Sequence, residues 1–98
     1  MLFMIIERFT HRDPLPIYTR LRDEGRGAPE GLTYVDSWVE PNFDRCFQLM
    51  ECDDLRLIQK WILHWRGLAT FEVVPVLSSK ETKDLVGPYL HARPSEIG

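Results

Sequence analysis

The chain alternates between stretches with an apolar repeat of two and stretches with a helical repeat, and this alternation predicts its secondary structure. Residues 2–9 form an apolar run that closes with Glu7 and Arg8, which predicts a strand buried on both faces with its polar end at a rim of the sheet. Residues 32–39 are rich in β-branched and aromatic side chains, which predicts a second strand after a turn at residues 29–31.

Two more strands are predicted further along the chain. A break at residues 40–42 separates residues 32–39 from the run at residues 45–52, so these two runs are expected to form a hairpin with a short loop. Residues 70–77 predict the fourth strand. Pro75 indicates that this strand lies at an edge, because proline cannot donate a hydrogen bond to a sheet ladder.

Helix-start signals precede three segments. Asp13 and Pro14 suit the N-cap and first position of a helix that Gly25 and Gly27 end. Asp53 or Asp54 is expected to cap a second helix. That helix carries one broad apolar stripe, formed by Leu57, Ile58, Trp61, Ile62 and Trp65. The simplest explanation of the two tryptophans in the stripe is that they are core residues.

The last helix is short. Ser78 and Glu81 have the spacing of a capping box, and Gly87-Pro88 is expected to end the helix. We therefore expect one domain over residues 1–88 and a C-terminal tail over residues 89–98.

The resulting order, β-α-β-β-α-β with an added C-terminal helix, is that of an α+β, ferredoxin-like fold. Right-handed crossovers give a four-stranded antiparallel sheet in the order 4-1-3-2 with both main helices on one face. The first strand is nevertheless apolar on both faces, since Leu2, Met4 and Ile6 alternate with Phe3 and Ile5. A second sheet is expected to cover the face without helices, which predicts an obligate homodimer with its sheets packed face to face.

Composition narrows the class of partner. With 98 residues, of which 44% are hydrophobic and 28% charged, the chain has the usage of one globular domain. The formal charge is −3 and the pI about 5.5, and the arginines at positions 20–26 are interleaved with Asp23 and Glu24. We therefore expect no nucleic-acid partner.

The first residues, MLFMII, lack a basic segment and a small-residue cleavage site, and they are too few to span a bilayer. We expect no membrane association and a cytoplasmic location. Cys46 and Cys52 lie six apart in one predicted strand, which separates them by about 20 Å. A disulfide cannot bridge that distance, so both thiols are expected to be reduced and free.

Four blocks of sequence carry a resemblance to a known family. They are ERF at residues 7–9, YVDSW at 34–38, RCFQLME at 45–51 and FEVVPV at 71–76. Through them the chain resembles, over nearly its whole length, a family of small, mostly bacterial proteins known only as a domain of unknown function. By its order of elements it also resembles the dimeric alpha/beta-barrel superfamily.

The superfamily resemblance implies two sheets paired face to face and, in many members, a ligand between sheet and helices. Members include cofactor-free quinone-forming monooxygenases, haem-degrading enzymes, isomerases and proteins without known activity, so the fold selects no chemistry. The haem-degrading members use an asparagine on the first strand, where Glu7 stands here, and a tryptophan where this chain has residues 52–54. His64 does lie on the following helix, but the other departures disfavour haem.

Other familiar chemistries lack their motifs. The three histidines are far apart, at His11, His64 and His91, and no zinc or iron spacing is present. Gly25 and Gly27 follow a helix, whereas a phosphate-binding loop leads from a strand into one. Neither Ser37 nor Cys46 has a histidine close in sequence to activate it. We expect no metal, no cofactor and no nucleophilic catalysis.

The predicted sheet brings polar residues together at one rim. They come from the end of the first strand and from the strands beside it, and are Glu7, Arg8, Ser37, Trp38, Arg45, Cys46 and Glu72. Period-two alternation places Glu7 on the opposite face from Arg8, without indicating which of these faces meets the helices.

These polar residues have two explanations. In the first, Arg8 or Arg45 pairs with Glu7, Asp36 or Glu72 and only fixes strand register and dimer pairing. In the second, one carboxylate lies unpaired in a pocket lined by Tyr34, Trp38 and Trp61 and accepts a proton from a phenolic or enolic ligand. The candidate ligand-binding residues are Glu7, Arg8, Tyr34, Asp36, Ser37, Trp38, Gln48, Glu51, Trp61 and His64.

Two functions follow from these explanations. One is a protein that binds or turns over a small aromatic or quinone-like molecule without a cofactor. The other is a non-catalytic dimeric module for regulation or assembly. A pocket above about 300 Å³ between sheet and helices would favour the first, and a filled interior the second.

Overall fold

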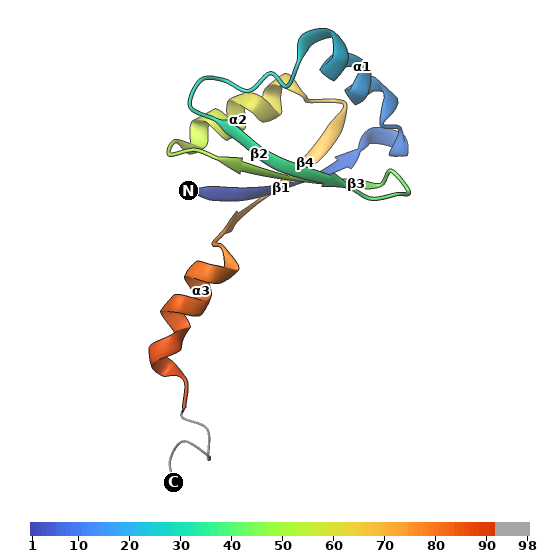
Figure 1. Cartoon of the computed structure of the whole chain (residues 1–98). Helices are drawn as coiled ribbons and strands as arrows, with labels where there is room; N and C mark the ends of the chain where they lie inside the picture. Colours follow the sequence, from blue (N-terminus) through green and yellow to red (C-terminus); the bar gives the residue numbers. More distant parts are fainter. Residues whose placement is uncertain (92–98) are drawn as a thin grey trace.

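The computed structural model describes residues 1–91, and within them it forms one α+β domain and a projecting C-terminal arm (Figure 1). The strands are β1 (Leu2–Phe9), β2 (Thr33–Val39), β3 (Arg45–Glu51) and β4 (Ala69–Val76). The helices are α1 (Leu15–Glu24), α2 (Leu55–His64) and α3 (Ser79–Val86), with short 3₁₀ turns η1 (Thr10–Arg12) and η2 (Gly87–Tyr89). Of the expected tail, residues 92–98 lie outside the described part of the chain.

The sheet has the order β2-β3-β1-β4, and all neighbouring strands are antiparallel. This is the predicted 4-1-3-2 order, and it confirms the ferredoxin-like topology. Figure 1 shows α1 and α2 on the same face of the sheet. Strand β4, which contains Pro75, is an edge strand as predicted.

Local signals account for the element boundaries. Asp54 caps α2 by accepting a hydrogen bond from the backbone N–H of Arg56 at 3.0 Å, and Ser78 caps α3 by accepting one from Glu81 at 3.1 Å. Asp13 accepts from the backbone N–H of Leu15 at 3.0 Å, so it does hold the first turn of α1, although the helix begins one residue later than predicted.

The core lies between the sheet and the two helices. On β1 the side chains of Phe3, Ile5, Glu7 and Phe9 are buried on this side. The core cluster consists of Phe3, Ile5, Leu32, Met50, Cys52, Ile58, Trp61 and Trp65. Both tryptophans are therefore core residues, and the face of β1 that carries Glu7 is the one that meets the helices.

A β-bulge in β2 was not predicted. Tyr34 pairs with Met50 and Asp36 with Leu49, so Val35 is an extra residue between two successive pairs. Because each residue of a strand points to the opposite face from the last, the extra residue changes the face of all that follow. Ser37 consequently lies on the helix-covered face.

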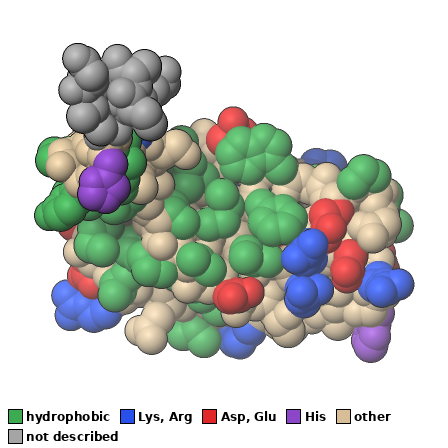
Figure 2. All heavy atoms as spheres, turned by 90° about the horizontal axis from the view of Figure 1, so that it is seen from below, with side chains coloured by type: hydrophobic (Ala, Val, Ile, Leu, Met, Phe, Trp, Pro, Cys, Tyr) green, Lys and Arg blue, Asp and Glu red, His purple; other side chains and the backbone are tan. Residues whose placement is uncertain are grey.

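The other face of the sheet carries no helix. Apolar side chains gather there, as Figure 2 shows. They are half-buried residues of β1, β3 and β4, namely Leu2, Met4, Ile6, Phe47, Leu49, Val74 and Val76. We call this surface the open face.

The C-terminal arm, residues 77–91, projects from the edge of the sheet (Figure 1). The side chains of Leu77, Leu85, Tyr89 and Leu90 on it are largely exposed, with Tyr89 at 80%. The radius of gyration is 18.3 Å, compared with about 13 Å for a compact chain of this length. Within the described residues, no helix is both long and apolar enough to cross a bilayer.

Candidate functional site

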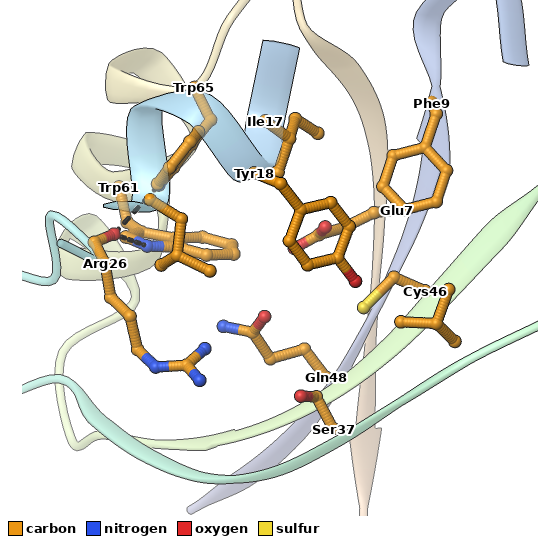
Figure 3. A pocket seen from close by; sticks show the side chains of 12 residues that line it. Glu7, Phe9, Ile17, Tyr18, Arg26, Ser37, Cys46, Gln48, Trp61 and Trp65 are labelled. Carbon is orange, nitrogen blue, oxygen red and sulfur yellow. Dashed lines mark hydrogen bonds between the residues drawn. The ribbon is translucent and has the colours of Figure 1, made fainter. Parts of the chain in front are cut away.

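A cavity of about 110 Å³ lies between the helix-covered face of the sheet and helices α1 and α2 (Figure 3). Its apolar walls are Phe9, Ile17, Leu21, Val39, Trp61 and Trp65. Its polar groups are Glu7, Tyr18, Arg26, Ser37, Cys46 and Gln48. The volume does not reach the 300 Å³ or so that would favour a ligand-binding protein, and the interior is not filled either, so neither of the two volume criteria is met. An engineered cavity of about 150 Å³ holds benzene, so a single ring is the appropriate scale.

Glu7 lies on β1 and its side chain enters this cavity. The residue is only 6% exposed, and burial raises the pKa of its carboxyl to about 7, although the positive charge of Arg26 lowers it in part. Within residues 1–91, the carboxyl of Glu7 takes part in no ion pair and in no side-chain hydrogen bond. A buried carboxyl without a partner exchanges its proton near neutral pH.

Arg26 lies in the loop between α1 and β2, and it is held by Trp61 of α2 and by Trp65, which directly follows that helix. The indole N–H groups of Trp61 and Trp65 both donate to the backbone carbonyl of Arg26, at 3.0 and 2.9 Å. The flanking Gly25 and Gly27 have φ values of +74° and +69°, a left-handed conformation that favours glycine. The backbone of Arg26 is thereby fixed against α2.

Two other titratable groups at the cavity are kept neutral. Burial, with the nearby Glu7, raises the pKa of the Cys46 thiol to about 12. Burial also raises the pKa of the Tyr18 hydroxyl, and Cys46 and Glu7 add to that effect. A thiol with so high a pKa is protonated and unreactive at neutral pH. Cys46 and Cys52 are both buried and free, as predicted.

Five of the predicted site residues lie at or beside the cavity. Glu7, Ser37, Gln48 and Trp61 line it. The Tyr34 hydroxyl is 2.7 Å from the hydroxyl oxygen of Ser37, which places it next to the wall. Gln48 is buried, and its amide N–H donates to the sulfur of Met50 at 3.1 Å.

The structure does not bring the other five to the cavity. Trp38 pairs with Phe47 on the open face and is 52% exposed, so the prediction that it lines the pocket is wrong. Asp36 also faces away and only accepts a hydrogen bond from the backbone N–H of Ser37. Arg8, Glu51 and His64 are exposed, with Arg8 on the face opposite Glu7.

The predicted cross-strand ion pairs do not form within the described chain. Arg45 donates two hydrogen bonds to Glu40, at 2.7 and 3.1 Å, across the β2–β3 hairpin. A guanidinium nitrogen of Arg8 lies 3.6 Å from a carboxylate oxygen of Asp44, a residue of the same hairpin. These pairs close the hairpin and leave Glu7 without a cation in direct contact.

Arg26 and Tyr18 were missed in the sequence. An arginine between two glycines directly after a helix was an available signal for Arg26, but those glycines also serve simply to end the helix. Within residues 1–91, no group of three or more His, Cys, Asp and Glu side chains is placed to hold a metal ion.

Comparison with known proteins gives a family without an assigned activity. The family model described as "Domain of unknown function (DUF3303)" matches residues 1–90. No curated protein and no solved structure matches the chain.

Proposed function

The chain belongs to this family of unknown function, and because membership assigns no ligand, we propose from the site itself that the cavity binds a small planar molecule with an acidic hydroxyl, a phenol or an enol. The observation that carries the proposal is Glu7, a buried and unpaired carboxyl beside a cavity of single-ring size. Burying such a group without a partner costs stability, and a function that uses the carboxyl would explain why it is kept.

The chemistry at the site is a proton transfer. The O–H bond of the ligand breaks, its proton moves to a carboxylate oxygen of Glu7, and the electron pair stays on the ligand oxygen. Since the pKa of Glu7 is about 7, a substantial fraction of the carboxyl is ionised and ready to accept at neutral pH. The positive charge of Arg26 stabilises the resulting phenolate or enolate.

The walls suit a flat apolar ligand. Trp61 and Phe71 form an edge-to-face pair with ring centroids 5.6 Å apart, which holds the indole of Trp61 rigidly at the cavity. Trp61 and Trp65 are further fixed by their hydrogen bonds to Arg26. Rigid aromatic walls bind a planar ring with little loss of side-chain entropy.

The three tryptophans make the proposal testable by NMR. Titration with phenol should shift the indole N–H resonances of Trp61 and Trp65, which line the cavity, and not that of Trp38 on the open face. Anisole, the methyl ether that lacks the acidic proton, should bind more weakly by roughly tenfold, because a hydrogen bond to a charged group is lost.

The variant Glu7→Gln should remove the preference for phenol over anisole. Glu30→Gln, at an exposed loop position, is the matched control and should retain the preference. The proposal is wrong if phenol and anisole bind the wild-type protein equally, or if neither shifts Trp61 or Trp65.

A second proposal concerns assembly, and the open face supports it. We propose that two copies pair through this face, because its central apolar side chains are only half-buried in one chain. The exposed apolar residues of the arm would then lie against the partner copy. In the alternative, non-catalytic function, this pairing would be the whole role of the protein.

We also propose that the protein works in the cytoplasm. Two buried free thiols and no disulfide within the described residues are compatible with a reducing compartment.

A further inference from the structure

Arg26 differs from most arginines of the described chain in having no carboxylate partner. Six others lie within 4.0 Å of a carboxylate oxygen, namely Arg8, Arg12, Arg20, Arg22, Arg45 and Arg56. Within residues 1–91 the guanidinium of Arg26 has neither such an ion pair nor a hydrogen bond, although the residue is half-buried at the cavity. A guanidinium carries five N–H donors, and no protein group within residues 1–91 accepts a hydrogen bond from those of Arg26.

The position of this guanidinium is built by its surroundings. Its central carbon lies 3.5 Å from the ring centroid of Tyr34, so one flat side is covered by stacking. The backbone carbonyl is held by Trp61 and Trp65, which are thus positioning residues for Arg26. Figure 3 shows the guanidinium and the amide of Gln48 pointing toward one another across the cavity.

Stacking leaves the edge of the guanidinium available. That edge is a planar fork whose paired N–H groups match the two oxygens of a carboxylate, and such bidentate contacts are among the strongest hydrogen bonds in proteins. A lysine or a neutral donor would not give this match.

The charge of the cavity favours an anion. When Glu7 is protonated, Arg26 is the only charged side chain among the lining residues, since Cys46 and Tyr18 remain neutral. An anionic group then compensates a half-buried cation.

We propose that Arg26 binds a carboxylate of the ligand, so that the ligand class is a small planar carboxylic acid. The proposal deepens the function proposed above and rests on it for the acidic hydroxyl: the same molecule would present a carboxylate to Arg26 and a hydroxyl to Glu7. Protonated Glu7 would donate a hydrogen bond to that hydroxyl, and Glu7 that has lost its proton would accept the proton of the hydroxyl.

Binding of a carboxylate should be linked to the protonation of Glu7. Ionised Glu7 repels the ligand carboxylate, and its negative charge offsets part of the attraction that Arg26 exerts on that carboxylate. The other groups facing Glu7 are Tyr18 from α1 and Cys46 from β3, and both stay neutral over the range tested, while α2 contributes only indoles. Carboxylate affinity should therefore fall as pH rises through about 7.

The test compares benzoate with benzamide, its neutral isostere, by the shifts of the Trp61 and Trp65 indole resonances. Wild-type protein should prefer benzoate, and Arg26→Gln should weaken benzoate binding roughly tenfold or more and remove the preference for benzoate over benzamide. Arg26→Lys should give an intermediate loss, because it keeps the charge and loses the fork. Arg22→Gln, an exposed position on α1, is the matched control and should bind benzoate normally.

A pH series on the wild-type protein supplies a second readout that needs no Arg26 variant. Benzoate should bind several-fold more tightly at about pH 6 than at about pH 8, and Glu7→Gln should abolish this difference. The inference is overturned if benzoate binds no better than benzamide, or if Arg26→Gln binds benzoate as well as wild type. Failure of the proposed function is a separate result, because it is read from phenol against anisole.

Discussion

Glu7 is the residue whose environment departs most from the pattern around it. It stands in a row of helix-facing residues on β1 in which Phe3, Ile5 and Phe9 are apolar and buried. A carboxyl in such a row is destabilising when ionised, because no described cation contacts it and the interior solvates charge poorly. This cost is the basis of the proposal that Glu7 is retained for its chemistry.

Stability should report this cost through its pH dependence. The pKa of Glu7 is about 7 in the folded chain and close to its ordinary 4.5 in the unfolded chain, so the folded state binds more protons between these values. The contribution of Glu7 to stability is therefore complete below about pH 4.5, falls as pH rises to about 7, and stays low above it.

Glu7→Gln should remove that slope. We expect the variant to be more stable than the wild type at about pH 8, by an amount on the order of 3 kcal/mol at most, and the difference to shrink as the pH falls toward 4.5. Chemical denaturation at several pH values measures this. A loss of more than about 2 kcal/mol at pH 8 in Glu7→Gln would make Glu7 a structural residue instead.

At the scale of the elements, the sequence was sufficient for the strands and helices and insufficient for their faces. Residues 2–9 were predicted as a strand and form β1 with those bounds, because an apolar run and its polar end are local signals. The edge position of the strand with Pro75 and the capping of α2 by Asp54 were also predicted. Each depends on backbone hydrogen bonds at or near the residue itself.

The site was less predictable, for two reasons. The bulge at Val35 places Ser37 on the helix-covered face of the sheet and Trp38 on the open face. The pattern of apolar and polar residues at positions 34–38 does not indicate an inserted residue. Arg26 reaches the cavity only because Trp61 and Trp65, far along the chain, bind its carbonyl. Contacts between distant segments of this kind are not encoded in local spacing.

At the scale of the whole molecule, the described chain leaves two apolar surfaces without a cover. The open face has no helix over it, and the arm extends away from its own sheet. Apolar side chains that gather uncovered on one face of a sheet are typical of an interface. A two-fold pairing of open faces would bury both surfaces with copies of the same chain.

Equilibrium sedimentation tests the homodimer. The wild-type protein should be a dimer at micromolar concentration, and Leu49→Glu, at the centre of the open face, should dissociate it because a buried unpaired charge is costly. Leu63→Glu changes an exposed leucine of α2 and should leave the dimer intact. A well-folded wild-type monomer at that concentration would contradict the pairing.

The central claim is that Glu7 holds a proton near neutral pH in a cavity made to receive a ligand, and titration of its side-chain carboxyl by carbon NMR tests it most directly. We expect a midpoint near pH 7 for Glu7. A midpoint for Glu7 close to 4.5 would mean that the carboxyl is solvated or paired, and it would contradict both the proposed proton transfer and the site built around it.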